Sequence, residues 1–405
     1  MKYDFDKTIS RSNTNCIKWD YLDAFFGESD LHAMWVADMD FVAPPEILDP
    51  IKDRAAHGVF GYTAKPDEFY STVIRWFRRR YHWDIEREWI VTTLGVVPAL
   101  NLAMQEFTEP GDGVIIQSPV YFPFKESVDL NGRELLDNTL ILKDGHYEID
   151  WQDLEEKAGN AKMFLFCSPH NPVSRVWTTG ELEQLGDICK RHDLMVFSDE
   201  IHADIIFRPN RHVPTAMVSN DLASRTIAAY ATSKTFNLAG LQLSVNIIPD
   251  NKLRERFKLT LERLHMTMSN IFGMVGTQAA YKNGERWLEE LIQYLWQNYL
   301  TVKKFLSEEI PDITVIEPEG TYLLWLDCSK LKLSDEELAA FFVQKAHLAL
   351  SSGALFGPGG SGFMRMNIGC PKQSVLKGLE TLKRAMDDDS PLVIDPGPAN
   401  VPDDC

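Results

Sequence analysis

The chain has 405 residues, 44% of them hydrophobic, and a formal net charge of −18. A chain of this size can bury one large core and a smaller second one, and its negative charge argues against nucleic acids and anionic membranes as partners. The six cysteines include no C-x-x-C pair, so neither a disulfide framework nor a metal site is expected. No apolar run reaches about 20 residues and the charged start does not match a signal peptide, so the sequence predicts a cytoplasmic protein.

Apolar runs typical of strands alternate with amphipathic runs typical of helices over residues 46–285. This pattern predicts a large α/β domain with a mainly parallel sheet, whose ligands bind at the carboxyl ends of the strands. We expect residues 1–45 to form an N-terminal arm and a segment of a smaller domain, and residues 286–388 to complete that smaller domain. Residues 389–405 are rich in proline and aspartate without a period, which predicts a disordered tail.

The first candidate site in chain order is the turn Gly95-Val96-Val97, which precedes a predicted helix through Leu100 and Met104. Free amides at the start of a helix bind anions, and glycine allows close approach of the ligand. This turn is therefore a candidate phosphate site. Taken alone, it is explained about as well by an ordinary strand-to-helix turn.

Three further candidate side chains follow predicted strands. Tyr121 follows the apolar run at residues 114–116 and offers a ring that can stack on a flat cofactor. Asn171 follows the run at residues 164–167, and its amide can donate a hydrogen bond to a phenolate oxygen. Asp199 ends a further apolar run and offers a carboxylate that can pair with a pyridinium nitrogen, with Asp204 as the alternative partner.

Lys234 follows the apolar run at residues 226–231, in the segment Ser-Lys-Thr-Phe-Asn-Leu-Ala-Gly. A lysine stripped of water at the end of a buried strand has a lowered pKa, so its amine can hold an aldehyde cofactor as a Schiff base. Each of the four groups alone is explained by a cap or a turn. Together, at four strand ends, they indicate pyridoxal 5′-phosphate (PLP), with Lys234 and Asp199 as catalytic residues.

Two elements and one basic residue stand out in the C-terminal part. Residues 286–308 predict a long helix, because apolar residues recur at spacings of four, three and four: Leu288, Ile292, Leu295 and Tyr299. Residues 320–326 predict a strand. Arg365 lies in an apolar run and is the candidate for the substrate carboxylate, since a guanidinium binds a carboxylate through two parallel hydrogen bonds. The alternative is a surface arginine on an edge strand.

Several motifs are typical of one enzyme family: Met-Trp-Val-Ala-Asp-Met-Asp-Phe at residues 34–41, Gly-Tyr at 61–62, Gly-Val-Val-Pro-Ala at 95–99, Ser-Pro-His-Asn-Pro at 168–172, Asp-Glu-Ile-His at 199–202 and the segment 233–240. Through them the chain resembles the fold-type I PLP enzymes, the aspartate aminotransferase superfamily, over about residues 3–388. It is most similar to the cystathionine β-lyase branch of the MalY and PatB type. The resemblance implies a seven-stranded, mainly parallel sheet flanked by helices, and a smaller α+β C-terminal domain.

The resemblance also implies roles for residues that the pattern alone does not assign. Tyr62 resembles the tyrosine that reaches the phosphate of the partner subunit, which implies a homodimer; the alternative is a core aromatic residue. His202 stands where typical aminotransferases have a tyrosine, as in the lyase branch, and is expected at the cofactor; the alternative is a structural histidine. On the substrate side the resemblance places Arg365, Asn171 and Trp35.

The sequence departs from the family pattern near the cofactor. Gln242 stands where aminotransferases commonly have an arginine that binds the phosphate. In place of that arginine, we expect backbone amides, Thr232 and Ser233 to bind the phosphate. Ser174 and Leu94 replace a common glycine and a common proline.

The activity implied by the resemblance is the α,β-elimination of L-cystathionine or a related cysteine S-conjugate to a thiol, pyruvate and ammonia. The Lys234 amine would remove the Cα proton, and a thiolate would leave from Cβ. Two alternatives stay open at this point. One is a class I/II aminotransferase, and the other is a regulatory PLP-binding protein of the same fold.

Overall fold

The computed structural model describes residues 2–388 and 390–393. Its largest sheet has seven strands in the order β2-β10-β9-β8-β7-β3-β4. Neighbours from β9 to β4 are parallel, whereas β10 is antiparallel to both of its neighbours. The strands are β2 (Ile90–Thr93), β3 (Gly113–Ile116), β4 (Glu134–Asp137), β7 (Ala161–Cys167), β8 (Met195–Asp199), β9 (Thr226–Tyr230) and β10 (Ser244–Ile247). The predicted seven-stranded, mainly parallel sheet is confirmed.

The central strands are apolar because helices cover both of their faces. In β7, Met163 and Leu165 pack into one core and Phe164 and Phe166 into another, as expected when successive side chains point to opposite faces. One core includes α5 (Val96–Phe107), α6 (Pro123–Leu130) and α11 (Asn251–Arg263), and the other includes α7 (Trp151–Ala158), α8 (Thr179–Arg191) and α9 (Asn220–Arg225). Side chains of α4 (Asp67–Tyr81) and α12 (Ile271–Asn283) pack near β2, β9 and β10, and α3 (Pro45–Ala56) lies against α12.

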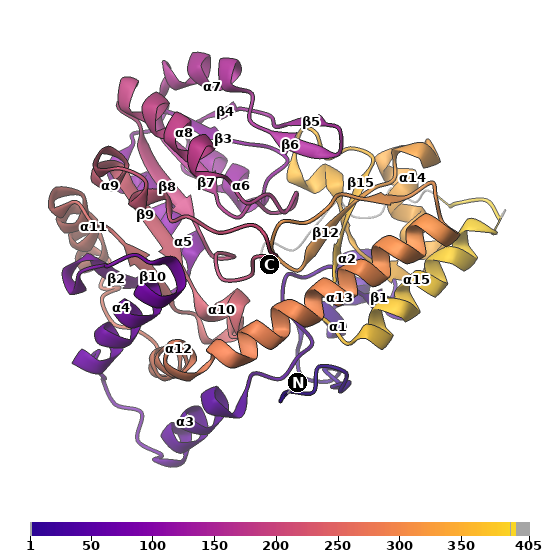
Figure 1. The fold of residues 1–405 in the computed structure, drawn as a ribbon, viewed down its shortest axis with the longest axis horizontal. Coiled ribbons are helices and arrows are strands. Elements are labelled where there is room, and N and C mark those ends of the chain that lie inside the picture. Colours follow the sequence, from indigo (N-terminus) through magenta and orange to yellow (C-terminus); the bar gives the residue numbers. More distant parts are fainter. Residues whose placement is uncertain (1, 389, 394–405) are drawn as a thin grey trace.

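The C-terminal part is built on a four-stranded sheet in the order β11-β12-β15-β14. Its elements are β11 (Thr314–Val315), β12 (Leu323–Asp327), β14 (Ser351–Ser352), β15 (Phe363–Asn367), α14 (Asp335–Ala340) and α15 (Lys372–Met386). The long helix α13 (Glu285–Glu309) runs from the large sheet to this smaller part (Figure 1). It confirms the helix predicted at residues 286–308, and three of its four predicted apolar positions are fully buried.

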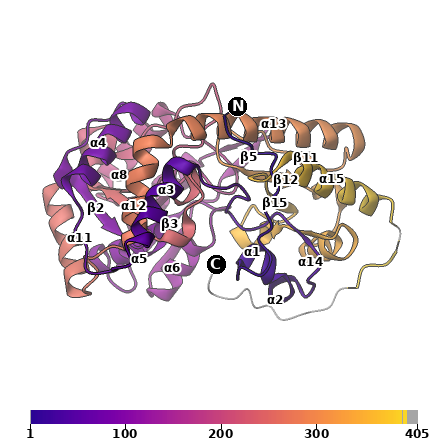
Figure 2. The same ribbon diagram turned by 90° about the horizontal axis from the view of Figure 1, so that it is seen from below.

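The N-terminal arm packs on the smaller part rather than on the large sheet. Its strand β1 (His32–Ala33) pairs with β13 (Leu348–Ala349), and Figure 2 shows its helices α1 (Ile17–Asp20) and α2 (Leu22–Phe26) beside α14. A separate hairpin joins β5 (Ile141–Lys143) and β6 (His146–Glu148).

The strands of the two main sheets fall on either side of α13 in the sequence, in keeping with the domain limits proposed from the sequence, which stay a proposal. The predicted tail falls almost wholly outside the described residues. None of the helices in the described part of the chain has both the length and the apolar character of a membrane span.

Candidate active site

A cavity of about 360 Å³ lies at the carboxyl ends of β7, β8 and β9. Its lining includes Tyr121, Asn171, Asp199, His202 and Lys234. The structure therefore brings together the groups that the sequence placed at four separate strand ends. This convergence follows from the parallel arrangement of the strands, since their carboxyl ends meet at one edge of the sheet.

Lys234 lies on α10 (Thr232–Thr235) and lines both this cavity and a second one. Its Nζ donates a hydrogen bond to the carbonyl oxygen of Ala37 at 2.8 Å. Burial lowers the pKa of the lysine, and the nearby guanidinium of Arg365 lowers it further, against the opposing effect of Asp38 and Asp199. The direction of the shift is the one that the sequence predicted, and it favours the neutral, nucleophilic amine.

The short helix that holds Lys234 depends on contacts from distant segments, because four residues do not form a stable helix alone. The Thr235 hydroxyl donates to Asp204 at 2.9 Å. The Asn237 amide donates to the carbonyl oxygen of Met39 at 2.7 Å. Asp204 also accepts from Trp76 and Tyr81 and does not line the cavity, so the structure leaves Asp199 as the carboxylate beside the cofactor space.

Asp199 is only 4% exposed, and its Oδ1 accepts a hydrogen bond from the amide of Ile201 at 3.0 Å. Burial raises the pKa of this carboxyl to about 7; Glu200 also raises it, whereas the Ile201 amide and Lys234 lower it. Asp199 forms no ion pair with any described residue. A buried carboxylate of this kind suits a cationic ligand, and the pyridinium nitrogen of PLP would supply the missing positive charge.

The raised pKa of Asp199 predicts a pH effect in the cofactor-free protein. The carboxyl has an ordinary value of 3.8 when unfolded and about 7 when folded, so the folded state holds this proton more tightly. Its contribution to stability is therefore full below 3.8 and is lost as pH rises through about 7, at up to about 1.4 kcal/mol per pH unit. We expect the thermal midpoint of the parent, compared with that of Asp199→Asn at the same pH, to fall as pH rises from 3.8 to about 7. Above about pH 7 the difference between the two midpoints should stay constant. Parallel curves throughout would contradict the raised pKa.

Arg365 is 4% exposed and lies on β15, which has neighbours on both sides in the small sheet. The alternative of a surface arginine on an edge strand is therefore wrong. Its Nη1 donates to Asn171 Oδ1 at 3.1 Å, and its Nη2 donates to the carbonyl oxygen of Trp35 at 2.9 Å and to Ser351 Oγ at 3.1 Å. Its Nε has no partner among the described residues.

Burial lowers the pKa of Arg365 to about 10, because no carboxylate compensates its charge. A buried, uncompensated cation is costly unless an anion reaches it. The Asn171 oxygen faces this guanidinium, which leaves the NH₂ group of the same side chain as the donor toward the cofactor cavity. The arrangement suits a ligand whose carboxylate meets Arg365 and whose ring meets Asn171.

His202 is buried in the cavity lining, where its ring makes an edge contact with Tyr322 at a centroid distance of 5.9 Å. Burial lowers the pKa of His202 to about 3, and the nearby Lys234 and Arg365 lower it further. The ring is therefore neutral at physiological pH. Its Nδ1 has no partner in the described part of the protein, so it can bond to a ligand in the cavity.

The predicted phosphate turn lies in the lining of the same cavity. Gly95 is the N-cap of α5, no side chain caps this helix, and Val96 and Val97 supply the amides of its first turn. Pro98, the next residue, has no amide hydrogen. The amides of this turn are thus the donors that the helix offers to an anion.

Ser233 and Gln242 also line the cavity, but Thr232 does not. Thr232 is buried, and its hydroxyl is hydrogen-bonded to the hydroxyl of Thr277 at 3.1 Å. Thr232 was predicted at the phosphate because Gln242 stands where aminotransferases commonly have a phosphate-binding arginine. The structure does not bring its side chain there, since the hydroxyl turns toward α12.

Tyr62 is not brought to the cavity of its own chain. It lies between α3 and α4 and is 97% exposed, next to the exposed apolar residues Val59 and Phe60. The alternative of a core aromatic residue is therefore wrong. Exposed apolar clusters of this kind commonly mark protein interfaces.

A second cavity, of about 590 Å³, adjoins the first through shared lining residues that include Tyr121 and Lys234. Arg365 and Trp35 lie in its lining. The Trp35 ring contacts Phe25 and Phe26 and donates from Nε1 to the carbonyl oxygen of Lys18 at 3.0 Å. Trp35 and Arg365, both predicted to bind the substrate, therefore line the same cavity.

Sequence reasoning missed a charged cluster of four residues, of which Arg11 and Asp38 line this cavity. Arg11 donates to Asp38 Oδ1 at 2.8 Å and to Asp40 Oδ1 at 2.7 Å, and Lys18 pairs with Asp40 at 2.8 Å. Asp38 and Asp40 belong to the motif at residues 34–41, but no role was assigned to them. The alternation of acids within that motif was the available signal, and their partners lie in the arm, about 20 to 30 residues earlier.

A protein-family comparison matches residues 36–382 to the model described as aminotransferase class I and II. The chain is 43% identical over 384 residues to cystathionine β-lyase PatB of Bacillus subtilis (strain 168), covering 94% of this chain and 99% of that protein. It is 32% identical over 389 residues to the protein MalY of Escherichia coli (strain K12), covering 95% and 99%.

Solved structures give the same result. A PLP-bound putative aminotransferase from Clostridium difficile 630 superposes with a TM-score of 0.93 at 43% identity, covering 95% of this chain and 100% of that one. Cystalysin from Treponema denticola, which contains PLP, superposes with a TM-score of 0.93 at 39% identity, covering 96% and 99%. The PLP-bound C-S lyase from Staphylococcus hominis gives 0.89 at 35% identity, covering 95% and 98%.

These matches span nearly the whole chain and agree with a cavity whose buried acid, buried amine and helix start suit PLP. The chain belongs to the class I and II aminotransferase family of PLP-dependent enzymes, in the carbon-sulfur β-lyase branch that includes PatB and MalY.

Proposed function

We propose that this enzyme is a carbon-sulfur β-lyase that converts L-cystathionine or a related cysteine S-conjugate to a thiol, pyruvate and ammonia. The observation that carries the proposal is the position of Lys234, whose amine lies in the lining of both the cofactor cavity and the cavity beside Arg365. An amine there can act on a substrate carbon that lies between the two. The adjoining space of about 590 Å³ gives room for a substituent on Cβ.

PLP, when bound, supplies an aldehyde for amino groups and a ring that accepts electrons. We propose that Asp199 pairs with its ring nitrogen and that the Asn171 amide donates to its phenolate oxygen, with the neutral ring of His202 beside it. Tyr121 would cover one face of the ring. The phosphate would lie at the amides of residues 95–97 and at Ser233.

The protein's own groups hold the substrate and remove its Cα proton. The guanidinium of Arg365 binds the substrate carboxylate in two-pronged fashion and fixes the position of Cα. The Lys234 amine, kept neutral by burial, removes the Cα proton. The Cβ–S bond then breaks, and its electron pair leaves with sulfur as a thiolate. The enamine that is released takes up water to give pyruvate and ammonia.

Thiol release provides the test of this reaction. Cystathionine, cystine and S-methylcysteine should each yield pyruvate together with a sulfur product, while alanine, which has no leaving group on Cβ, should yield none. An aminotransferase would instead exchange amino groups between an amino acid and a 2-oxo acid without releasing thiol. Exchange without thiol or pyruvate formation would refute the lyase.

We further propose that the enzyme is a cytoplasmic homodimer in which Tyr62 reaches the phosphate in the partner subunit. The support is that Tyr62 is 97% exposed, beside Val59 and Phe60, and outside the cavity of its own chain. Burying such a cluster between two copies would remove its apolar surface from water.

A shared site predicts complementation between two inactive subunits. In a hybrid dimer of one Tyr62→Ala chain and one Lys234→Ala chain, one site carries both defects and the other carries neither. Activity should reappear when the mixture is refolded, up to about a quarter of the parent level, because roughly half of the dimers are hybrid and each has one intact site.

The comparison needs the separate variants refolded alone and a measurement that hybrids are present. If hybrid dimers are present and the mixture is no more active than the two variants added together, Tyr62 acts in its own subunit's site or lies outside the site altogether.

A further inference from the structure

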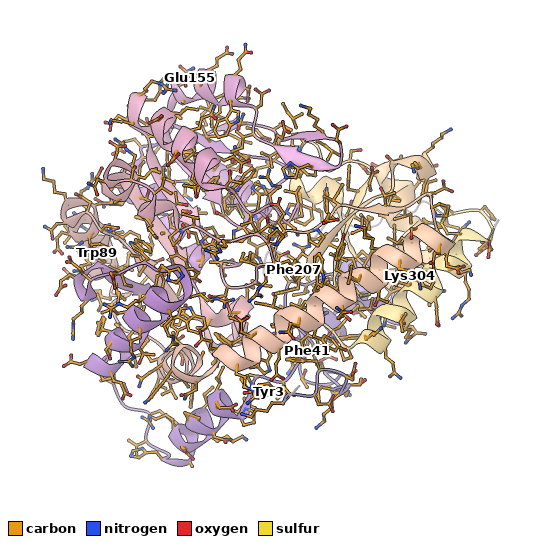
Figure 3. All side chains as sticks on the ribbon, in the orientation of Figure 1. Tyr3, Phe41, Trp89, Glu155, Phe207 and Lys304 are labelled. Carbon is orange, nitrogen blue, oxygen red and sulfur yellow. The ribbon has the colours of Figure 1, made fainter. Side chains whose placement is uncertain are left out.

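A third cavity, of about 980 Å³, lies between the end of α4, the segment 203–213 and α13. It shares no lining residue with the cofactor cavity or with the cavity beside Arg365. Figure 3 places Phe207, one of its lining residues, beside α13 in the middle of the molecule. This cleft is therefore separate from the site where the reaction is proposed to occur.

The cleft contains two positively charged side chains that pair with no described acid. Arg208 and Arg211 line it and are exposed, and neither forms an ion pair or a hydrogen bond with a described residue. The acid in the lining, Glu289, is already paired with Arg80. Two free guanidinium groups in a chain with a net charge of −18 form a local anion-attracting surface.

A buried histidine adds a polar group to the same cleft. The side chain of His212 is 2% exposed, and its Nε2 lies 2.6 Å from Glu200 Oε2. Because a carboxylate only accepts, Nε2 carries the hydrogen of this bond. The other ring nitrogen, Nδ1, bonds to no described residue and is therefore open to a ligand. In this tautomer Nδ1 is an acceptor, so it can take a hydrogen bond from an O–H group of a partly protonated anion.

The cleft is connected to the catalytic groups through the hydrogen bonds of two buried acids, Glu200 and Asp204. Glu200, the partner of His212, follows Asp199 directly in the chain. Arg80 donates to the carbonyl oxygen of Asp204 at 2.7 Å, and the carboxylate of Asp204 accepts from Thr235, the residue after Lys234. Through these contacts, His212 and Arg80 connect the cleft to the segments that hold Asp199 and Lys234.

We propose that this cleft is a regulatory site for a small polyvalent anion, which Arg208, Arg211 and His212 bind and whose occupancy is transmitted to the bound cofactor. Clustered negative charge is the feature that these side chains recognise. A phosphate compound and a polycarboxylate both have it. Pyrophosphate and citrate are the two probes that separate these sources.

Isothermal titration of the PLP-loaded enzyme, at fixed ionic strength, tests binding. We expect one site per subunit for at least one probe, weakened by roughly tenfold or more for each arginine removed in Arg208→Gln and Arg211→Gln. The matched control is the pair Arg256→Gln and Arg263→Gln, exposed arginines of α11 that contact Glu106 away from the cleft. Binding by pyrophosphate alone assigns a phosphate ligand, and binding by citrate alone assigns a polycarboxylate. No binding of either at millimolar concentration, or binding that survives both cleft substitutions, overturns the site.

The visible absorption of bound PLP tests the connection and does not depend on which substrate the enzyme cleaves. Saturation with the binding probe should change the pH dependence of this absorption in the parent enzyme and in the Arg256→Gln/Arg263→Gln control. The same probe should leave the spectrum of Arg208→Gln/Arg211→Gln unchanged. If a saturating concentration of the probe leaves the pH dependence of the parent's PLP absorption unchanged, the regulatory role is overturned.

Discussion

Lys234→Ala is expected to abolish turnover and to leave the protein with only weak affinity for PLP. The side chain supplies both the amine that holds the aldehyde and the base that removes the Cα proton, and positioned proton transfer alone contributes up to about 10⁴-fold. Among the described residues that line the cofactor cavity, Lys234 is the single lysine, so no second amine there can replace it. The parent should be yellow, and the variant should lose its visible absorption on dialysis.

Two comparison variants make this result specific to the amine. Lys234→Arg keeps a long basic side chain but cannot form the Schiff base, so it should be as inactive as Lys234→Ala. Lys157→Ala removes a lysine on α7 that pairs with Asp153, and it should keep both the colour and the thiol release of the parent. Thiol release by Lys234→Ala at the parent rate would remove the basis of the whole mechanism.

The location of the site was predictable because each catalytic candidate stands beside a feature that is local in sequence. Asp199 and Lys234 directly follow apolar runs, and parallel strands of one sheet end at one edge. The helix from residue 285 to 309 was predictable for the same reason, since its apolar period lies within its own sequence. Local patterns therefore predicted which residues lie together at the site, but not which hydrogen bonds they form.

The bonds that position the catalytic groups join segments far apart in the chain. Lys234 Nζ contacts the carbonyl oxygen of Ala37, 197 positions earlier, and Arg365 contacts the carbonyl oxygen of Trp35, 330 positions earlier. No period or cap encodes such a pairing. The prediction for Thr232 was wrong for the same reason. Ser233 lines the cavity, but the Thr232 hydroxyl bonds to Thr277 on α12, 45 positions later in the chain.

The position of β10 shows this limit at the level of the fold. Its sequence reads as one more buried strand, but it lies between β2 and β9 and is antiparallel to both. Strand order depends on pairing between residues more than 150 positions apart in the case of β2, which an apolar run does not reveal. The family resemblance, rather than the strand pattern, supplied the number of strands.

Arg365→Lys is expected to lower kcat/KM sharply while PLP stays bound. The guanidinium is buried with contacts to Asn171, Trp35 and Ser351, and a lysine offers neither the planar fork nor these simultaneous contacts. Truncating one partner of a buried, hydrogen-bonded charge pair costs roughly 2–5 kcal/mol, which corresponds to about 30-fold to several thousand-fold in kcat/KM. Arg365→Gln, which also removes the charge, should be at least as impaired.

The loss must be separated from a general effect of changing a buried arginine. Arg254 is a matched control, because it is 6% exposed and donates to the carbonyl oxygens of Ile248 and Pro249 away from both active-site cavities. Arg254→Lys should lower the thermal midpoint and keep kcat/KM near the parent value, whereas Arg365→Lys should keep the visible absorption of bound PLP and lose kcat/KM. If instead Arg365→Lys retained kcat/KM within a few-fold of the parent, the substrate carboxylate would lie elsewhere, and the uncompensated charge of Arg365 would need another ligand.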